Sequence, residues 1–174
     1  MRFTSTAAFL LLTVFTAAPS LAQSLDDIVK AEKTVDAAWS QSPLRFRQAF
    51  FVSETPTGFG IYKQRPDAPF KVGDKLVVYA EPVGYGWKPN DDGTVTFGFY
   101  VDVAVKSPDG KVLFNQANFS HLALTSHARN HEFMLALTLD LSGADPGQYV
   151  LEYTTRDIAS DKSAVISLPF TLAN

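Results

Sequence analysis

Hydrophobic and polar residues alternate strictly in several parts of this chain, with the two-residue period of a β-strand. The stretch "TVTFGFYVDVAVK" places six apolar side chains on one face: Val95, Phe97, Phe99, Val101, Val103 and Val105. The segment "EFMLALTLDL" repeats the alternation from Phe133 to Leu141. Strands with this pattern bury one face and leave the other in water, as antiparallel sheets do. The pattern therefore predicts antiparallel sheets that pack through one face.

Turn signals divide most of the chain into short strands of this kind. The signals are "VGD", "PNDDG", "SPDG", "GADPG" and "ASD". The predicted strands are 45–54, 58–63, 75–81, 94–106, 111–124, 132–141, 148–157 and 163–172. Seven to nine short strands without intervening helices indicate an all-β antiparallel β-sandwich rather than an α/β fold. The pattern leaves open whether 111–124 is a single strand or two antiparallel passes.

Before residue 44 the hydrophobic period is helical. Five apolar residues fall near one helix face: Leu25, Ile28, Val29, Val35 and Trp39. Ser24 is a candidate N-cap, and Asp26 and Asp27 would lie in the first turn, where acidic side chains are favourable. We predict one amphipathic helix, with a linker, within residues 23–43. Its apolar stripe either covers one side of the domain or docks a partner or a second copy.

The first 22 residues have the features of a secretory signal peptide. Arg2 precedes an apolar run of about a dozen residues, and the small residues Ser20 and Ala22 occupy the −3 and −1 positions of a cleavage site. This run is shorter than the roughly 20 residues that a membrane-spanning helix needs. We therefore expect a periplasmic or secreted protein that does not span a membrane, with one domain over residues 44–174.

Composition narrows the function classes further. The chain contains no cysteine, which excludes thiol catalysis, disulfides and thiolate metal sites. Secretion without disulfides fits a bacterial periplasm. A net charge of −3 without a basic block argues against nucleic acid as a partner, since such binding depends on many Lys and Arg contacts to phosphate.

The segment "DPGQYVL", Asp145 to Leu151, resembles the D-x-G-x-Y-x-C motif of immunoglobulin-like domains. Asp145, Gly147 and Tyr149 match the motif, and Leu151 replaces its cysteine. In such domains the tyrosine hydroxyl bonds to backbone upstream and fixes a corner between strands. The resemblance implies an immunoglobulin-like sandwich that is held by packing without a disulfide.

Two longer stretches, 61–87 and 140–172, look like those of bacterial periplasmic proteins with an immunoglobulin-like sandwich. That resemblance brings no activity and no catalytic residues with it, because a fold does not determine a function.

If 111–124 is one strand, the loops 82–93, 125–131 and 158–162 all emerge at the same end of the sandwich. In variable domains that end carries the binding loops. Here the first loop would present Tyr85 and Trp87, whose amphipathic rings could anchor a partner. The alternative is that Trp87 folds inward and closes the end of the sandwich.

All three histidines, His121, His127 and His131, fall within "HLALTSHARNH". With Asp91 or Asp161 they could bind zinc or copper, which suit imidazole and carboxylate ligands. Their spacing matches no established ligand signature, which favours ordinary surface histidines that hydrogen-bond to loop backbone.

Arg65, in "YKQRPDAPF", is a candidate for binding a carboxylate or phosphate, or for a local pair with Asp67. The chain contains no G-x-S-x-G, H-E-x-x-H, P-loop or dinucleotide motif, and we do not expect an enzyme. A hydrolase could arise only from residues assembled in space.

These observations favour a non-catalytic periplasmic binding or scaffold module, without a cofactor, that recognises a protein or cell-envelope component through the loops at one end. The alternative function is a periplasmic zinc- or copper-binding protein that uses the histidines of 121–131. The oligomeric state stays open.

Overall fold

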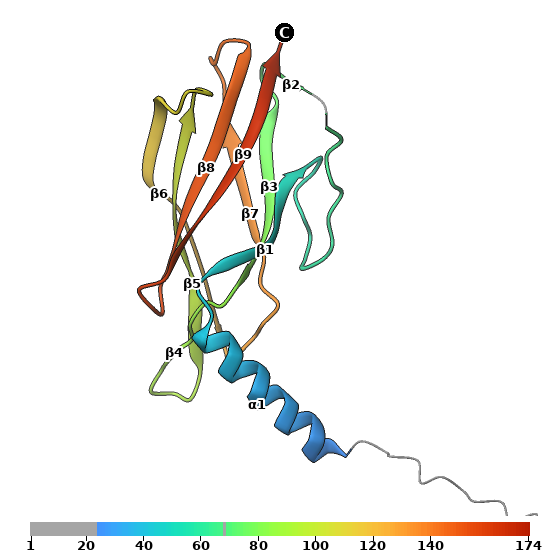
Figure 1. Ribbon diagram of the computed structural model, residues 1–174, viewed down its shortest axis with the longest axis vertical. Coiled ribbons are helices and arrows are strands. Elements are labelled where there is room, and N and C mark those ends of the chain that lie inside the picture. The colour runs from blue at the N-terminus through green and yellow to red at the C-terminus, as the bar shows by residue number, and fades with distance from the viewer. Residues whose placement is uncertain (1–23, 68) are drawn as a thin grey trace, which may run out of the picture.

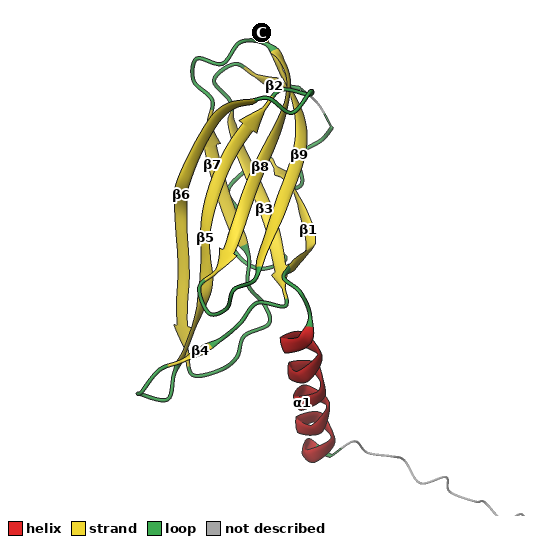
Figure 2. Ribbon diagram, turned by 60° about the vertical axis from the view of Figure 1, so that its left-hand side comes forward, coloured by secondary structure: helices red, strands yellow, loops and turns green. Residues whose placement is uncertain are grey.

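The computed structural model describes residues 24–67 and 69–174, in which a helix precedes two sheets packed face to face (Figures 1 and 2). The smaller sheet has the order β1(Arg45–Val52), β3(Lys75–Val83), β7(Leu135–Asp140). The larger sheet has the order β2(Phe70–Lys71), β9(Ser163–Ala173), β8(Gly147–Asp157), β5(Val95–Lys106), with β4(Lys88–Pro89) and β6(Val112–Ser126) also paired to β5. All of these pairs are antiparallel except β2 with β9. The predicted all-β sandwich preceded by a single helix is confirmed.

The core lies between the inner faces of the two sheets, as the alternation predicts. Alternate side chains of four strands are buried there, including Leu76 and Val78 of β3, Phe97 and Phe99 of β5, Leu135 and Leu137 of β7, and Leu151 and Tyr153 of β8. Such burial contributes roughly 1.5–3 kcal/mol for each large apolar side chain. The fold is thus held by packing between sheets.

The corner before β8 is closed by Tyr149. Its hydroxyl donates to the carbonyl oxygen of Asp145 at 2.6 Å, and its ring stacks on Phe170 with 5.3 Å between centres. Leu151, at the position of the cysteine in the motif, is fully buried. This position is therefore held by packing alone.

Of the two possibilities left open for 111–124, the structure shows the single strand, which begins at Val112. β6 pairs with β5 from Val112 to Ser126, with a break in register near Asn118. Asn118 has a positive φ of 50°, and its N–H donates to the Asp102 carboxylate at 2.7 Å. The side chain thus stabilises the irregular turn of β6, and the strand continues to the end of the sandwich next to the helix.

The strand predicted over 58–63 is wrong. These residues form a tight hairpin held by the isolated bridges Val52↔Gln64 and Gly58↔Ile61. The hairpin lies over the outer face of β3, where the Gly60 N–H donates to the hydroxyl of Tyr79 at 2.7 Å. Contact with the buried Tyr79 ring, rather than a sheet ladder, determines its conformation. The sequence also did not reveal the short strands β2 and β4.

The helix α1 spans Leu25–Gln41 and begins at a capping box, as its sequence predicts. The Ser24 hydroxyl accepts from the N–H of Asp27, and the Asp27 carboxylate accepts from the N–H of Ser24 at 3.0 Å. These hydrogen bonds lower the pKa of Asp27. The helix ends at Ser42, before Pro43, since the residue preceding a proline disfavours helical geometry.

Most of α1 projects away from the sandwich (Figure 2), and Trp39 is its buried residue. The interpretation that its stripe covers one side of the domain is therefore wrong for all but the last turns. No helix in residues 24–67 and 69–174 is long and apolar enough to cross a membrane. The predicted signal peptide, residues 1–22, lies outside the described residues.

Candidate functional site

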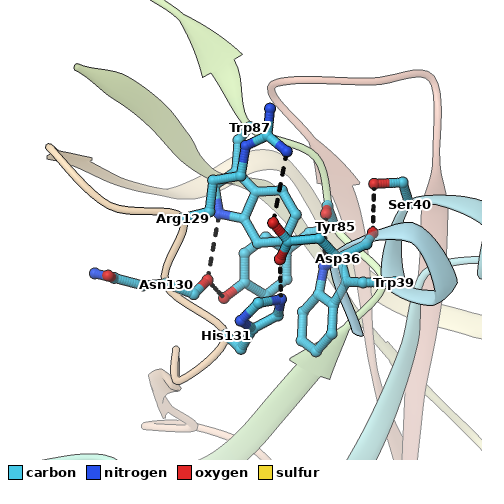
Figure 3. Close-up of polar contacts among 8 residues, drawn as sticks. All are labelled: Asp36, Trp39, Ser40, Tyr85, Trp87, Arg129, Asn130 and His131. Carbon is cyan, nitrogen blue, oxygen red and sulfur yellow. Dashed lines mark hydrogen bonds and ion pairs between the residues drawn. The ribbon is translucent and has the colours of Figure 1, made fainter. Parts of the chain in front are cut away.

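The last turns of α1 are fixed to the loop between β3 and β4 by Trp39 (Figure 3). This side chain is 7% exposed, and its Nε1 donates to the carbonyl oxygen of Tyr85 at 2.8 Å. Its ring meets Tyr85 edge-on, with 5.1 Å between centres, and stacks against Trp87 at 5.8 Å. A buried indole with its N–H satisfied is a strong anchor. The direction of α1 is therefore determined by the end of the sandwich.

Tyr85 is fully buried, so the expectation that its ring is exposed to a partner is wrong. It packs against Phe97, Phe99 and Phe133 with 5.8–6.0 Å between ring centres. Its hydroxyl donates to the carbonyl oxygen of Asn130 at 2.7 Å, which ties two loops together. Burial raises the pKa of Tyr85, and the negative charge of Asp157 raises it further.

Trp87 is half-buried and closes the end of the sandwich. Of the two predictions for this residue, the structure thus shows the one in which its ring folds inward. Its Nε1 donates to the same Asn130 carbonyl oxygen at 3.2 Å. The Arg129 guanidinium lies 5.9 Å from the centre of its ring, and His131 meets it edge-on at 5.2 Å. Trp87 thus packs between α1 and the loop after β6, with part of its surface in solvent.

An acidic residue of α1 faces two basic residues of the loop after β6. Asp36 Oδ1 lies 3.1 Å from His131 Nε2, and Asp36 Oδ2 lies 3.7 Å from Arg129 Nη1 (Figure 3). The His131 approach lacks hydrogen-bond geometry, since its Nε2 has no hydrogen-bond partner among the described residues. These contacts orient the helix about its axis.

The three histidines occupy different surroundings. His121 stacks on Tyr100 on the outer face of the larger sheet, with 4.4 Å between ring centres. His127 is exposed in the turn after β6, and His131 contacts Trp39 and Asp36. Within 24–67 and 69–174, no three His, Cys, Asp or Glu side chains come together as a metal site would require. Nothing in this placement favours zinc or copper binding.

Arg65 does not join this end of the molecule. Its guanidinium lies 4.0 Å from the ring centre of Phe70 in β2, at the end of the sandwich opposite α1 (Figure 1). It donates to the carbonyl oxygen of Pro69 at 3.2 Å and lies 3.6 Å from Asp74, so its acidic neighbour is Asp74 rather than the expected Asp67. Arg65 therefore packs the β1–β2 connection onto the sandwich.

Two residues that the sequence did not reveal hold the loops at the α1 end. Asp157 is buried, and its carboxylate accepts from the N–H of Gly86 at 2.7 Å and of Ala159 at 2.9 Å. Lys162 donates to the carbonyl oxygens of Gly84 at 2.7 Å and Ser40 at 3.0 Å. No sequence motif marks them, because their partners are up to 122 residues away.

The outer part of α1 leaves apolar side chains in solvent. Leu25 is 74% exposed, Ile28 is 50% exposed and Val35 is 51% exposed. Ile28 and Val35 border a shallow hollow of about 290 Å³, together with Asp27, Glu32 and His131. This exposed stripe of α1 leads to the aromatic residues at the base of the helix, which are Trp39, Tyr85, Trp87 and His131.

Comparisons of the chain with protein-family models, with curated proteins and with solved structures found no match. Three features at this end of the sandwich can contribute to a function. They are the fixed helix α1, the exposed apolar stripe on that helix, and the carboxylates beside the stripe.

Proposed function

We propose that this protein is a non-catalytic binding module that acts outside the cytoplasm and presents α1 to a protein partner. The observation that carries the proposal is the exposed apolar stripe, Leu25, Ile28 and Val35, on a helix whose last turns are fixed by Trp39. The signal-like segment over residues 1–22 supports a location in the periplasm or outside the cell.

Burial of this stripe supplies a driving force for binding. Ile28, Val35 and Leu25 each keep half or more of their surface in water, and full burial of such a side chain is worth roughly 1.5–3 kcal/mol. An isolated helix of 17 residues is marginal in water, but α1 is capped at Ser24 and held at Trp39. A partner would therefore meet a helix that is already formed, which lowers the entropic cost of binding.

The stripe specifies the chemistry of the partner surface. Ile28 and Val35 are seven residues apart and therefore stand one above the other, as anchors do when a helix lies in an apolar groove. Asp27 and Glu32 flank them, so the rim of that groove should carry Lys or Arg. A lipid surface fits less well, because helices that bind anionic membranes carry basic residues beside their apolar face.

The test is site-specific photo-crosslinking in cells that make the protein. A photoreactive residue at position 28 or 35 probes the stripe, and one at Ala37 is the matched control. Ala37 is exposed and lies nine residues, or two and a half turns, after Ile28, on the opposite face of α1.

The proposal expects one protein to crosslink from positions 28 and 35 and not from position 37. The purified form of that protein should bind the wild-type chain and bind the Ile28→Glu variant at least tenfold more weakly, whereas Ala37→Glu has little effect. Equal crosslinking from both faces, or crosslinking of α1 to a second copy of the chain, would contradict the proposal.

A further inference from the structure

Strand β6 forms the free edge of the larger sheet (Figure 2). It pairs with β5 along one side, and no other strand within 24–67 and 69–174 pairs with it. With 15 residues it is the longest described strand. An open strand edge presents unpaired backbone N–H and C=O groups that can pair with another chain. β6 is thus a surface on which a further strand can add.

Between Ser120 and Ser126 this edge lacks the features that usually prevent such pairing, and the register break of β6 lies before this segment, near Asn118. Natural edges are protected by charged residues, by proline, by bulges or by short length. The residues from Val112 to Ala128 include no Lys, Arg, Asp, Glu or Pro. Three other edge strands have such protection: Arg45 and Arg47 on β1, Pro169 on β9, and Asp140 on the short β7.

The inner face of β6 is also only partly covered. Leu122 and Leu124 pair with the core residues Phe99 and Phe97 and therefore point to the inside of the sandwich. Even so, Leu124 is 49% exposed, and Phe114, opposite the buried Val105, is 44% exposed. The edge therefore offers apolar surface in addition to hydrogen-bonding groups.

The sequence of the strand indicates which chain would occupy this edge. Residues 120–126, "SHLALTS", read almost the same in both directions around Ala123. In an antiparallel pair of two such strands, Leu122 lies opposite Leu124 and Ser120 lies opposite Ser126. Apolar residues that lie directly opposite each other stabilise a pair of strands. The chain has a net charge of −3, but this segment carries no Lys, Arg, Asp or Glu, so pairing two copies of it brings no like charges together. These features favour a second copy over an unrelated chain.

We propose that two copies of this protein pair antiparallel through β6 around a twofold axis at Ala123, so that their larger sheets become one continuous sheet. The pairing is isologous, as in most homodimers. It leaves α1 free and does not depend on the function proposed for that helix.

Sedimentation velocity of the purified protein over a concentration series tests the dimer. The wild-type chain should shift from the mass of one chain to that of two. Leu124→Lys places an ammonium group opposite Leu122 of the second copy and should weaken the dimer at least tenfold. Val165→Lys is the control, since Val165 is an equally exposed strand residue, 56%, on β9. A monomer at all concentrations, or an equal effect of both variants, would overturn the proposal.

Cysteine crosslinking tests the register, because the natural chain contains no cysteine. Two Ala123→Cys side chains would face each other at the axis, with about 4.5–5.5 Å between their Cβ atoms, and should form a disulfide on mild oxidation. Leu113→Cys is 50% exposed on the same strand but ten residues from the axis, so its two thiols would lie roughly 65 Å apart. Efficient crosslinking of Ala123→Cys alone supports the proposal, and equal crosslinking of both variants contradicts it.

Discussion

The indole N–H of Trp39 donates to the carbonyl oxygen of Tyr85, 46 residues further along the chain, at 2.8 Å. This contact joins α1 to the sandwich, and Trp39 is the buried residue of the helix. The direction in which α1 presents its exposed stripe thus depends mainly on this side chain, with the Asp36 and Lys162 contacts beside it.

Replacement of Trp39 should therefore release α1 and weaken the fold. Trp39→Ala removes a buried aromatic ring and is expected to cost about 3–5 kcal/mol in the free energy of unfolding. Trp39→Phe keeps much of the packing and should cost less, although it leaves the Tyr85 carbonyl oxygen without its donor. Urea unfolding measures the stability, and amide hydrogen exchange over 36–41 measures the release of the helix. Ile28→Ala is the control, because Ile28 is already half-exposed.

Three of the six tyrosines should resist ionisation while the protein is folded. Burial raises the pKa of Tyr79 to about 12, helped by its hydrogen bond to Glu81, and burial raises the pKa values of Tyr85 and Tyr153 as well. Because these folded-state pKa values exceed that of an unfolded tyrosine, near 10, the corresponding stability is complete below about pH 10. It is lost as the pH rises through 10 towards 12 and beyond.

Absorbance at 295 nm during an alkaline titration measures this effect. The folded protein should remain about two phenolates short of the urea-unfolded protein at pH 10.5, because a tyrosine with a pKa near 10 is roughly three-quarters ionised there. The missing absorbance should appear with unfolding, and Tyr79→Phe should reduce the deficit by about one third. Ionisation of all six tyrosines below pH 10.5 in a protein that is still folded would show that these rings are not buried as described.

The ion pair of Asp102 and Arg156 should make a small contribution that disappears in acid. Arg156 donates through Nε and Nη2 to the two oxygens of Asp102 at 3.1 and 2.8 Å, and these bonds lower the pKa of Asp102. Stability from a lowered carboxyl pKa is present above the unfolded value, near 4, and is lost as the pH falls through the folded value. Both side chains are partly exposed, so we expect about 0.5–1 kcal/mol at pH 7.

Asp102→Asn isolates this contribution. Urea unfolding should show the variant to be less stable than the wild type at pH 7, and the difference should shrink towards pH 2.5, where the carboxylate is protonated. A difference that is the same at both pH values would assign the effect to packing rather than to charge.

Gly98 allows β5 and β6 to approach each other, and its replacement should separate them. A Cβ on Gly98 would lie 2.0 Å from the carbonyl oxygen of Leu122, and its φ of 149° is also unfavourable for other residues. Because the obstacle is backbone, Gly98→Ala should cost about 3 kcal/mol or more. Gly110→Ala also introduces a side chain at positive φ, 88°, but into open space, and should cost only about 1 kcal/mol. Equal losses of stability in the two variants would contradict the close approach.

The strict alternation of residues 95–105 and 133–141 was sufficient to predict β5 and the region of β7. Alternation predicts a strand reliably when one of its faces is buried by a second layer, as both of these are. The segment 58–63 also reads as strand, but it folds back as a hairpin, and only a single bridge, Val52↔Gln64, joins this connection to β1. Local pattern could not distinguish these cases, because pairing is a property of distant segments.

The candidate site was predictable only in its position. If 111–124 is one strand, as the structure shows, chain order alone places the loops with Tyr85, Trp87 and His131 at one end. Whether each ring points inward was not predictable, because glycine-rich loops permit both directions. Burial of Tyr85 follows from the space left between Phe97 and Phe133 and from the acceptor offered by Asn130.

By itself, the sequence determined the local structure of this protein. The capping box at Ser24, the alternation of its strands, the corner at Tyr149 and the absence of charge along β6 are all properties of neighbouring residues. Tertiary structure alone decided which apolar surfaces are covered. Trp39 is buried and Ile28 is exposed on the same helix face, and Leu124 is exposed although it points inward. The physical reason is that burial depends on what lies opposite a side chain, and that neighbour is supplied by segments tens of residues away.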